Sequence, residues 1–397
     1  MYTFVTLEVA VIKPNPFTPR SGQEPKVFLN RDDEIAFFQK RMHELQNHDA
    51  NHYILNGSWG VGKTSLLKYF KLFAQEKGFH SSYFSIQEFP EHVDDEKITV
   101  HILQSISRAL PLQLKKDSRL LKYLEGFGIQ VLGTGFNVNF RLDKNIMLDS
   151  QSLLLDGLIN IWGELKDSKG VIVLIDDAHN LSQVTRYMTT IRNVLSHDDI
   201  MKGTNYLFIL SSTVEGWKPF MIRNHPIGRF FIPRLELKRF NQGNTYKLIE
   251  ETLKGTGVKF GKELFPFIWE HTNGHLFEVH SLCRTLYDLQ ERGIVGNNKA
   301  DIALNESVMY LGTTIFEQIL SSASEREKEI LYAISFLKKP SSIDEITNQL
   351  GKLKIKKSAL KSYLSKLVDK NLLSHPKRGL YVIEDRMFRL YVNKSHA

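Results

Sequence analysis

Short apolar runs alternate with amphipathic stretches over the first part of the chain. Val171–Ile175 and Tyr206–Leu210 are continuous apolar runs, which is typical of strands buried on both faces of a parallel sheet. Two further strands are predicted at His52–Leu55 and Ser82–Ile86. Helical spacing predicts one helix capped by Asp32 or Asp33 and another that ends near Gly78; their apolar stripes are Ile35, Phe38, Met42 and Leu45, and Leu66, Leu67, Phe70 and Phe73. This alternation of strands and helices predicts a three-layer α/β domain over residues 27–234.

Two segments depart from this alternation. Residues 1–26 contain four prolines, which exclude a regular helix, so we expect an extended segment that wraps a neighbouring surface. In residues 127–143 two β-favouring arms flank Gly133 and Gly135, which predicts a hairpin inserted into the core. We expect this hairpin to cover an edge of the sheet, and contact with DNA or a neighbouring subunit stays an alternative.

The rest of the chain divides into two smaller units. Residues 235–322 have helical periodicity with short Gly or Asn turns, which predicts a small helical domain. Residues 323–397 begin with two capping boxes, Ser324–Glu327 and Ser342–Glu345, each of which opens a short helix. A third amphipathic helix follows, and then two strands, predicted at Leu372–Leu373 and Leu380–Ile383, flank a turn. Three helices followed by two strands is the order of a winged helix-turn-helix.

The composition is that of a folded chain. With 42% hydrophobic and 24% charged residues, the disordered and fibrous classes are excluded, and 397 residues predict about two to four domains. No run approaches about 18 apolar residues, and Glu8 interrupts the start of the chain, so we expect neither a membrane span nor a secretory signal. The single cysteine, Cys283, lies in an apolar helical stretch, so we expect a small buried hydrophobe and a cytoplasmic protein.

The positive charge is concentrated near the carboxyl end. The net charge is +8, and residues 352–378 hold nine Lys or Arg against one acid, Asp369. A basic module on an otherwise balanced chain favours binding to a polyanion. In helix-turn-helix proteins the third helix enters the major groove and the basic wing contacts the DNA backbone. The candidate DNA-binding residues are Lys354, Lys356, Lys357, Lys361, Lys366, Lys377 and Arg378.

Lysine dominates this basic set. Lys binds phosphate as a point charge, whereas bidentate reading of guanine favours Arg. We therefore expect binding to double-stranded DNA that depends strongly on salt and has a modest sequence preference. A protein-binding face and a merely solvated helix stay alternatives.

The segment from Gly57 to Thr64 reads GSWGVGKT and lies between a predicted strand and a predicted helix. This spacing is that of a phosphate-binding loop, in which glycines let backbone N–H groups surround phosphate oxygens at the positive end of a helix dipole. Lys63 is expected to neutralise the β and γ phosphates, and the Thr64 hydroxyl to bind Mg²⁺. The expected nucleotide-binding residues of the loop are Gly57, Ser58, Trp59, Gly60, Val61, Gly62, Lys63, Thr64 and Ser65.

A magnesium ion held by Thr64 needs a further anionic ligand on a rigid element. Asp176 and Asp177 end the apolar run at Val171–Ile175, so we expect Asp176 in the metal shell and Asp177 to orient the attacking water. Asp177 is one methylene shorter than Glu, and because a misplacement of about 1 Å costs about 100-fold in rate, we expect slow hydrolysis. The alternative for this acidic pair is a helix cap.

Two more groups are sought near the same edge of the sheet. Ser211, Ser212 and Thr213 end the run at Tyr206–Leu210, and one of these hydroxyls is expected to touch the γ-phosphate or the water; Ser212 is our candidate, and the other two stay open. An arginine finger stabilises charge in the transition state, and the candidates for it are Arg223, Arg229 and Arg234. We choose Arg229, with a surface arginine that has no such role as the alternative.

These residues resemble the AAA+/STAND-type ATPases that are common in archaea. Within that group the chain is similar to replication-initiator ATPases of the origin-recognition type. The resemblance covers nearly the whole chain and rests on Asn15–Phe17, Leu29–Glu34, the glycine loop, Asp176–His179 and Ser211–Thr213. It implies that Asn30 and Arg31 pack near the adenine, that residues 235–322 form a lid, and that a winged helix ends the chain.

The sequence departs from that family pattern at three places. Asn30 stands where glycine is usual, and Asp177 stands where Glu is common. Asn273–Phe277 lacks the Pro or Arg that the nucleotide sensor of the lid usually offers, and His275 is left unassigned.

The sequence therefore predicts a slow ATPase with ATP and Mg²⁺ as cofactors, acting as a nucleotide-controlled DNA-binding and assembly switch through its basic winged helix. The main alternative is a STAND-type signalling or transcription regulator whose winged helix contacts protein. A small-molecule phosphotransferase is a third hypothesis, but it lacks a recognisable acceptor-binding lid and leaves the basic end unexplained.

Overall fold

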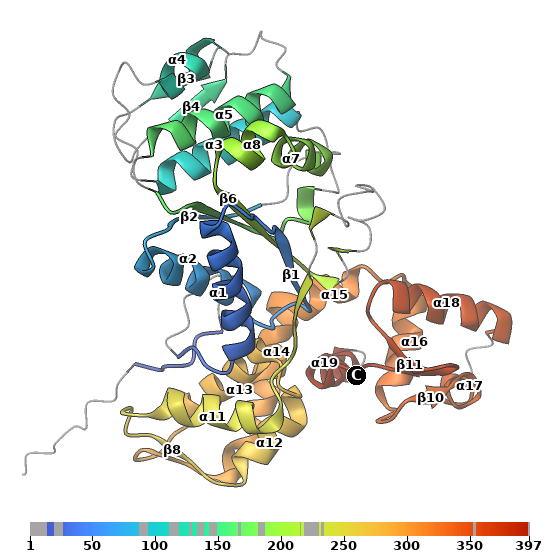
Figure 1. The fold of residues 1–397 in the computed structure, drawn as a ribbon. Coiled ribbons are helices and arrows are strands. Elements are labelled where there is room, and N and C mark those ends of the chain that lie inside the picture. The colour runs from blue at the N-terminus through green and yellow to red at the C-terminus, as the bar shows by residue number, and fades with distance from the viewer. Residues whose placement is uncertain are drawn as a thin grey trace, which may run out of the picture. The chain divides into compact units, whose positions relative to one another are not determined.

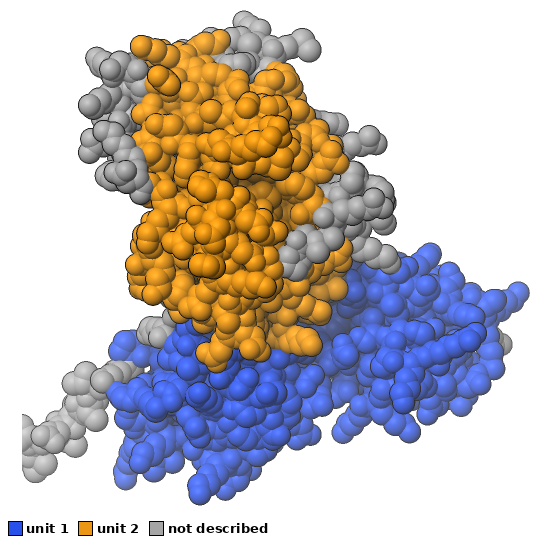
Figure 2. Space-filling view, viewed as in Figure 1, with its two compact units in different colours: residues 1–30, 239–397 blue, residues 31–238 orange. Residues whose placement is uncertain are grey.

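The structure is a computed structural model with two compact units (Figures 1 and 2). One unit comprises residues 31–238, and the other comprises residues 1–30 and 239–397. The residues that it describes are 14–19, 27–86, 94–110, 119–126, 129–132, 139–142, 149–165, 168–181, 187–214, 216–217, 230–231, 234–351 and 355–395.

A five-stranded parallel sheet forms the centre of the first unit. Its strands lie in the order β2-β5-β6-β1-β7, so β6 lies between β1 and β5. All four predicted strands are confirmed, and a fifth, β7, extends the unit to Lys238 because Gly57 pairs with Leu237. The strands are β1 (Tyr53–Gly57), β2 (His80–Ser85), β5 (Val171–Asp176), β6 (Tyr206–Ser212) and β7 (Arg234–Leu237).

Helices cover both faces of this sheet, as expected for three layers (Figure 1). α1 (Asp32–Gln46) and α2 (Lys63–Glu76) lie on one side, where the rings of Phe38 and Phe70 stack with their centres 4.1 Å apart. The other side carries α3 (Asp95–Ala109), α5 (Ser150–Glu164), α7 (Tyr187–Leu195) and α8 (Asp198–Gly203).

The predicted cap of α1 is wrong. Arg31 is the N-cap residue and makes no side-chain cap hydrogen bond, while Asp32 and Asp33 lie inside the first turn. Carboxylates in that position still favour the helix, because they face the positive end of its dipole.

The predicted hairpin is confirmed as β3 (Ile129–Leu132) and β4 (Asn139–Leu142), which pair antiparallel with Ile129 opposite Leu142. The hairpin forms its own two-stranded sheet beside α3 and α4 (Arg119–Gly126), and not at the sheet edge where we expected it (Figure 1).

The second unit contains a helical part. Its elements are α11 (Gln242–Leu253), β8 (Lys259–Phe260), α12 (Leu264–Thr272), α13 (Leu276–Asp288), β9 (Ile294–Val295), η1 (Asn297–Lys299), α14 (Ala300–Leu311), the π-helical η2 (Gly312–Phe316) and α15 (Glu317–Ser321). Of the predicted extended segment 1–26, residues 14–19 lie against this part: the Asn15 amide donates to the Arg284 carbonyl at 3.0 Å, and Phe17 is fully buried. Residues 1–13 and 20–26 lie outside the described residues, so the rest of this segment stays a prediction. Cys283 is also fully buried, which confirms its expected place in the core.

The carboxyl-terminal part contains the three predicted helices and two strands, with β10 and α19 in addition. Its elements are α16 (Glu325–Ser335), β10 (Ser341–Ser342), α17 (Ile343–Leu350), α18 (Lys357–Asp369), β11 (Ser374–Lys377), β12 (Leu380–Val382) and α19 (Arg386–Ser395). Both capping boxes are formed. Leu372 and Leu373 are buried ahead of β11, so this strand begins later than predicted.

None of the described helices has the length and apolar character needed to cross a membrane.

Candidate functional site

The glycine loop connects β1 to α2 at the carboxyl edge of the sheet. Gly60 and Gly62 have φ values of 73° and 98°, in the left-handed region that glycine adopts without steric cost. Gly57 has no room for a side chain, because a Cβ there would lie 2.8 Å from the Leu237 carbonyl oxygen. Gly62 is the N-cap of α2 and offers no side chain to the first-turn N–H groups, so these donors stay available to an anion.

Lys63 lies over this loop. Its side chain is buried, and its ammonium donates to the Gly57 carbonyl at 2.9 Å and to the Ser58 carbonyl at 3.0 Å. A positive charge therefore lies beside the same backbone that the glycines bend, and an anion at this loop would be attracted to it.

Four donors converge on the buried carboxylate of Asp176. The Thr64 hydroxyl donates to Oδ2 at 2.6 Å, and the Tyr83 hydroxyl donates to the same oxygen at 3.0 Å. The Ser211 hydroxyl donates to Oδ1, which also accepts the Asp177 backbone N–H at 3.2 Å. The structure thus brings together the loop, the acidic strand and one of the three candidate hydroxyls.

The oxygens of Thr64 and Asp176 fit Mg²⁺. This ion prefers oxygen ligands and is usually held by one or two carboxylates together with substrate phosphates. Among the residues that the structure describes, no cluster of three or more His, Cys, Asp or Glu side chains could hold a metal by itself. A hydroxyl 2.6 Å from a carboxylate at the phosphate loop is a donor set of the kind that a nucleotide-bound Mg²⁺ uses.

Asp177 has left-handed backbone geometry, with φ at 54°, which Asp tolerates better than most residues. Burial and the neighbouring charge of Asp176 raise the pKa of Asp177 above its ordinary value, and the charge of Lys63 opposes this shift. Burial, together with the charge of Lys63, lowers the pKa of His179 to about 4, so this imidazole is neutral near pH 7. The His179 ring also fills the space where a side chain at Gly216 would lie.

Ser212 and Thr213 make different contacts from Ser211. The Ser212 hydroxyl is buried and donates to the Thr213 carbonyl at 2.9 Å, while the Thr213 hydroxyl accepts the Gly216 N–H at 2.9 Å. Because side chains alternate along a strand, Ser211 and Ser212 lie on opposite faces of β6. Of the three candidate hydroxyls, Ser211 is the one bonded to the acidic pair.

Arg31 is hydrogen-bonded to the backbone of the glycine loop. Its buried guanidinium donates to the Val61 carbonyl at 2.8 Å, to the Lys238 carbonyl at 3.3 Å and to Glu34 at 3.1 Å. Burial lowers the pKa of Arg31, although the nearby charge of Glu34 opposes this. Asn30 has φ at 56°, which explains why Asn can stand where glycine is usual: both residues adopt the left-handed conformation.

Several candidates lie elsewhere. Arg229, Arg223 and Lys354 lie outside the described residues. Arg234 lies on β7 with its guanidinium 4.9 Å from the centre of the Trp217 ring. His275 is buried in the second unit, with Nδ1 3.6 Å from Glu278 Oε1, and burial and the proximity of Asp385 raise the pKa of Glu278.

Tyr83 was missed by the sequence analysis. The strand that carries it was predicted, but a tyrosine in a strand gives no sign of which neighbour it meets. The pairing of Tyr83 with Leu174 decides this, and that pairing is not a local property of the sequence.

The candidate DNA-binding residues that the structure describes are exposed, although two of these lysines have partners. Lys357 forms an ion pair with Asp344 at 2.6 Å, and the Lys366 ammonium lies 5.8 Å from the centre of the Tyr363 ring. The exposed candidates among the described residues are Lys356, Lys357, Lys361, Lys366, Lys377 and Arg378.

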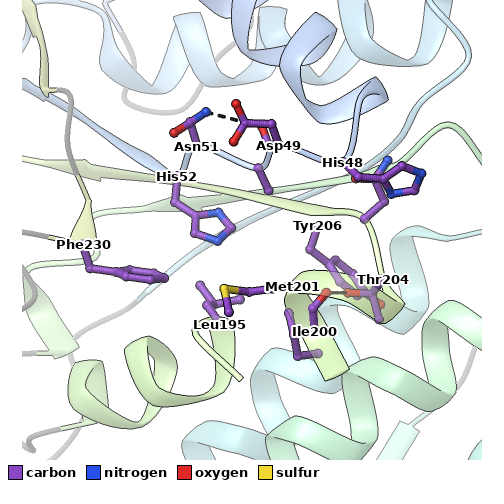
Figure 3. Close-up of a pocket in the computed structure, with 12 residues that line it drawn as sticks. His48, Asp49, Asn51, His52, Leu195, Ile200, Met201, Thr204, Tyr206 and Phe230 are labelled. Atoms are coloured by element: carbon purple, nitrogen blue, oxygen red, sulfur yellow. Dashed lines mark hydrogen bonds between the residues drawn. The ribbon is translucent and has the colours of Figure 1, made fainter. Parts of the chain in front are cut away.

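A cavity of about 310 Å³ lies at the amino ends of β1 and β6, and so at the opposite edge of the sheet from the glycine loop (Figure 3). Aromatic and aliphatic side chains contribute to its walls, including His52, Tyr206, Phe230 and Met201. His52 Nδ1 accepts the Phe208 N–H at 3.0 Å, and burial lowers the pKa of His52 to about 4. This cavity is separate from the phosphate loop.

Comparisons with known proteins agree with this fold. A model of the KAP family P-loop domain matches residues 35–212. A search of curated proteins finds no match. A Walker-type ATPase of Pyrococcus abyssi is similar in structure, with 16% identity, a TM-score of 0.63, and coverage of 95% of this chain and 99% of that one.

Two further solved structures are similar. The Aeropyrum pernix ORC2 protein, in complexes with ADPNP and ADP, has 15% identity and a TM-score of 0.63 and covers 95% of this chain and 97% of that one. Cdc6p of Pyrobaculum aerophilum has 14% identity and a TM-score of 0.50, with the same coverage. The chain therefore has a P-loop NTPase fold, and the expected likeness to origin-recognition-type ATPases is confirmed at the level of the fold.

Proposed function

We propose that this chain binds ATP with Mg²⁺ at the glycine loop and hydrolyses the nucleotide slowly. The observation that carries the proposal is the 2.6 Å hydrogen bond from Thr64 to Asp176, because it joins the phosphate loop to the acidic end of β5. Two comparisons support it: the KAP-type match spans both elements, and the ORC2 protein of similar fold was solved in complexes with ADPNP and ADP.

In this proposal each group has one task. The loop N–H groups and Lys63 bind phosphate, and Thr64 and Asp176 hold Mg²⁺, which when bound offsets charge on the phosphates. Asp177 accepts a hydrogen bond from the attacking water, and its short side chain aligns that water poorly. Ser212 and Arg229 stay candidates for contacts with the γ-phosphate, and Asn30 and Arg31 for the surroundings of the base.

ATP turnover tests this part. A misalignment cost of about 100-fold against a typical kcat of about 10 s⁻¹ gives an expected rate of about 0.1 s⁻¹. Asp176→Asn should remove most of this turnover, whereas Asp156→Asn, an acid on α5, should not. Turnover that survives Asp176→Asn unchanged would exclude the proposed metal site.

We further propose that the nucleotide state controls binding of double-stranded DNA by a winged helix at residues 323–397. The order of α16, α17, α18, β11 and β12 supports this, as do the exposed basic side chains on α18, at the end of β11 and in the turn that follows it. Lys361, Lys377 and Arg378 form no ion pair with any described acid. Cations of this kind bind phosphate by releasing counterions, so the affinity should fall steeply with salt.

Fluorescence anisotropy with a labelled duplex tests the DNA proposal with ATP, with ADP and without nucleotide. Replacing Lys361, Lys377 and Arg378 together by Ala should reduce the slope of log affinity against log salt by about three. The matched control replaces three exposed lysines of the same unit, Lys247, Lys259 and Lys262, and should leave the slope nearly unchanged. A flat salt dependence would remove the DNA proposal and leave a protein-binding regulator, and equal affinity in all three nucleotide states would remove the switch.

A further inference from the structure

The carboxylate of Asp176 is held from both neighbouring strands of the sheet. Tyr83 on β2 donates its hydroxyl to Oδ2 at 3.0 Å, and Ser211 on β6 donates to Oδ1. Thr64, at the start of α2, also donates its hydroxyl to Oδ2, at 2.6 Å. The acid at the end of the central strand thus has a fixed partner on each side.

The register of the sheet places Tyr83 there. Ser85 pairs with Asp176 and Tyr83 pairs with Leu174, so the period of two along a strand puts Tyr83 on the same face as Asp176. α2 packs against this face, and the Lys68 ammonium lies 5.7 Å from the centre of the Tyr83 ring. A ring between a helix and a strand has little freedom, so the position of the hydroxyl is defined.

The four donors to Asp176 differ in which carboxylate oxygen they reach and in whether they could also bind the metal. A carboxylate has about four lone-pair sites, and Asp176, only 2% exposed, receives four donors. Thr64 and Tyr83 are the two that reach Oδ2, and Thr64 is itself a proposed ligand of Mg²⁺. Tyr83 is therefore the partner that orients Oδ2 without taking part in binding the metal.

Groups that orient a metal ligand without touching the metal have a measurable effect. Their removal typically lowers metal affinity by about 10- to 100-fold, because the ligand loses its preferred orientation. We propose that Tyr83 is a positioning residue that holds Asp176 for Mg²⁺. This inference rests on the proposed function, and it assigns Tyr83 no contact with the nucleotide.

The test measures binding of a fluorescent ATP analogue during titration with magnesium chloride, and in EDTA. Tyr83→Phe keeps the ring and removes the hydroxyl. The Mg²⁺ concentration that gives half of the magnesium-dependent gain in affinity should rise about 10-fold, while the affinity in EDTA stays within about twofold. The matched control is Tyr187→Phe, which removes another tyrosine hydroxyl of the same unit, 2.6 Å from the Thr99 hydroxyl and away from Asp176.

The outcomes separate the two levels of the hypothesis. If the wild-type protein responds to Mg²⁺ and Tyr83→Phe keeps the wild-type midpoint, the positioning role is wrong and the proposed function stands. The role is also wrong if Tyr83→Phe loses affinity equally in EDTA, or if Tyr187→Phe shifts the midpoint as much. If the wild-type protein binds no nucleotide, the proposed function fails and the role of Tyr83 fails with it.

Discussion

Ser211 and Ser212 are adjacent and both buried, yet the structure predicts different effects when each is replaced by Ala. The Ser211 hydroxyl donates to the Asp176 carboxylate and accepts the Asp177 N–H at 3.0 Å. The Ser212 hydroxyl makes one neutral bond, to the Thr213 carbonyl at 2.9 Å. A buried hydrogen bond to a charged group contributes about 1.5 to 3 kcal/mol, against about 1 kcal/mol for a neutral one.

Ser211→Ala should therefore lower the free energy of unfolding by about 3 kcal/mol, because it removes the charged bond and a partner of a buried N–H. Ser212→Ala should cost about 1 kcal/mol. For a unit of this size, about 2 to 4 °C of Tm is lost per kcal/mol, so the expected losses are about 6 to 12 °C and about 2 to 4 °C.

Thermal unfolding followed by tryptophan fluorescence measures this difference. Three of the four tryptophans, Trp59, Trp162 and Trp217, lie in the unit that contains both serines. Equal losses of Tm in the two variants, or a larger loss for Ser212→Ala, would refute the assignment of Ser211 as the partner of Asp176.

Substitutions at three further positions, Asp177, Asn30 and Gly57, test local features of the structure. Asp177→Asn should raise the free energy of unfolding at pH 7 by less than about 1 kcal/mol and leave it unchanged at pH 3. Because the pKa of Asp177 is raised in the folded state, wild type keeps its full stability below the ordinary pKa of Asp and loses part of it as the pH rises through the folded-state pKa. A gain in stability of the variant that persists at pH 3 would contradict this. In urea unfolding, Asn30→Ala should cost about 1 kcal/mol and Asn30→Gly almost nothing, because φ is 56°, and equal costs would show that this conformation is not the constraint. Gly57→Ala should lower the free energy of unfolding by about 1 to 3 kcal/mol, since its Cβ would lie 2.8 Å from the Leu237 carbonyl oxygen. The control Gly163→Ala should lower it by nothing, because a Cβ there would have no atom within 4 Å. Similar losses in both variants would argue against the tight packing of the loop.

The parts of the fold that could be predicted depend on local signals. The buried strands are continuous apolar runs, the loop has a fixed glycine spacing, and both capping boxes place a Glu three residues after a Ser. Each signal is complete within a few residues, so the sequence alone is sufficient to place it.

The parts that could not be predicted depend on contacts between distant segments. Nothing local indicates that β6 lies between β1 and β5, yet this order brings Ser211 to Asp176. The choice between Ser211 and Ser212 depends on which face of β6 each occupies, and the contact of Tyr83 depends on the register of β2 against β5. The cap of α1 was misplaced because Asp favours both the cap and the first turn, and Arg31 at the cap is engaged by the Val61 carbonyl.

The central claim is that the glycine loop binds ATP with Mg²⁺. Isothermal titration calorimetry of ATP in the presence of Mg²⁺ tests it with wild type, Lys63→Ala and the control Lys169→Ala, an exposed lysine of the same unit. We expect wild type and the control to bind alike, and Lys63→Ala to bind about 10- to 100-fold more weakly, because a charged hydrogen bond contributes about 1.5 to 3 kcal/mol. Wild-type affinity in Lys63→Ala, or no heat of binding in the wild-type protein, would contradict the claim.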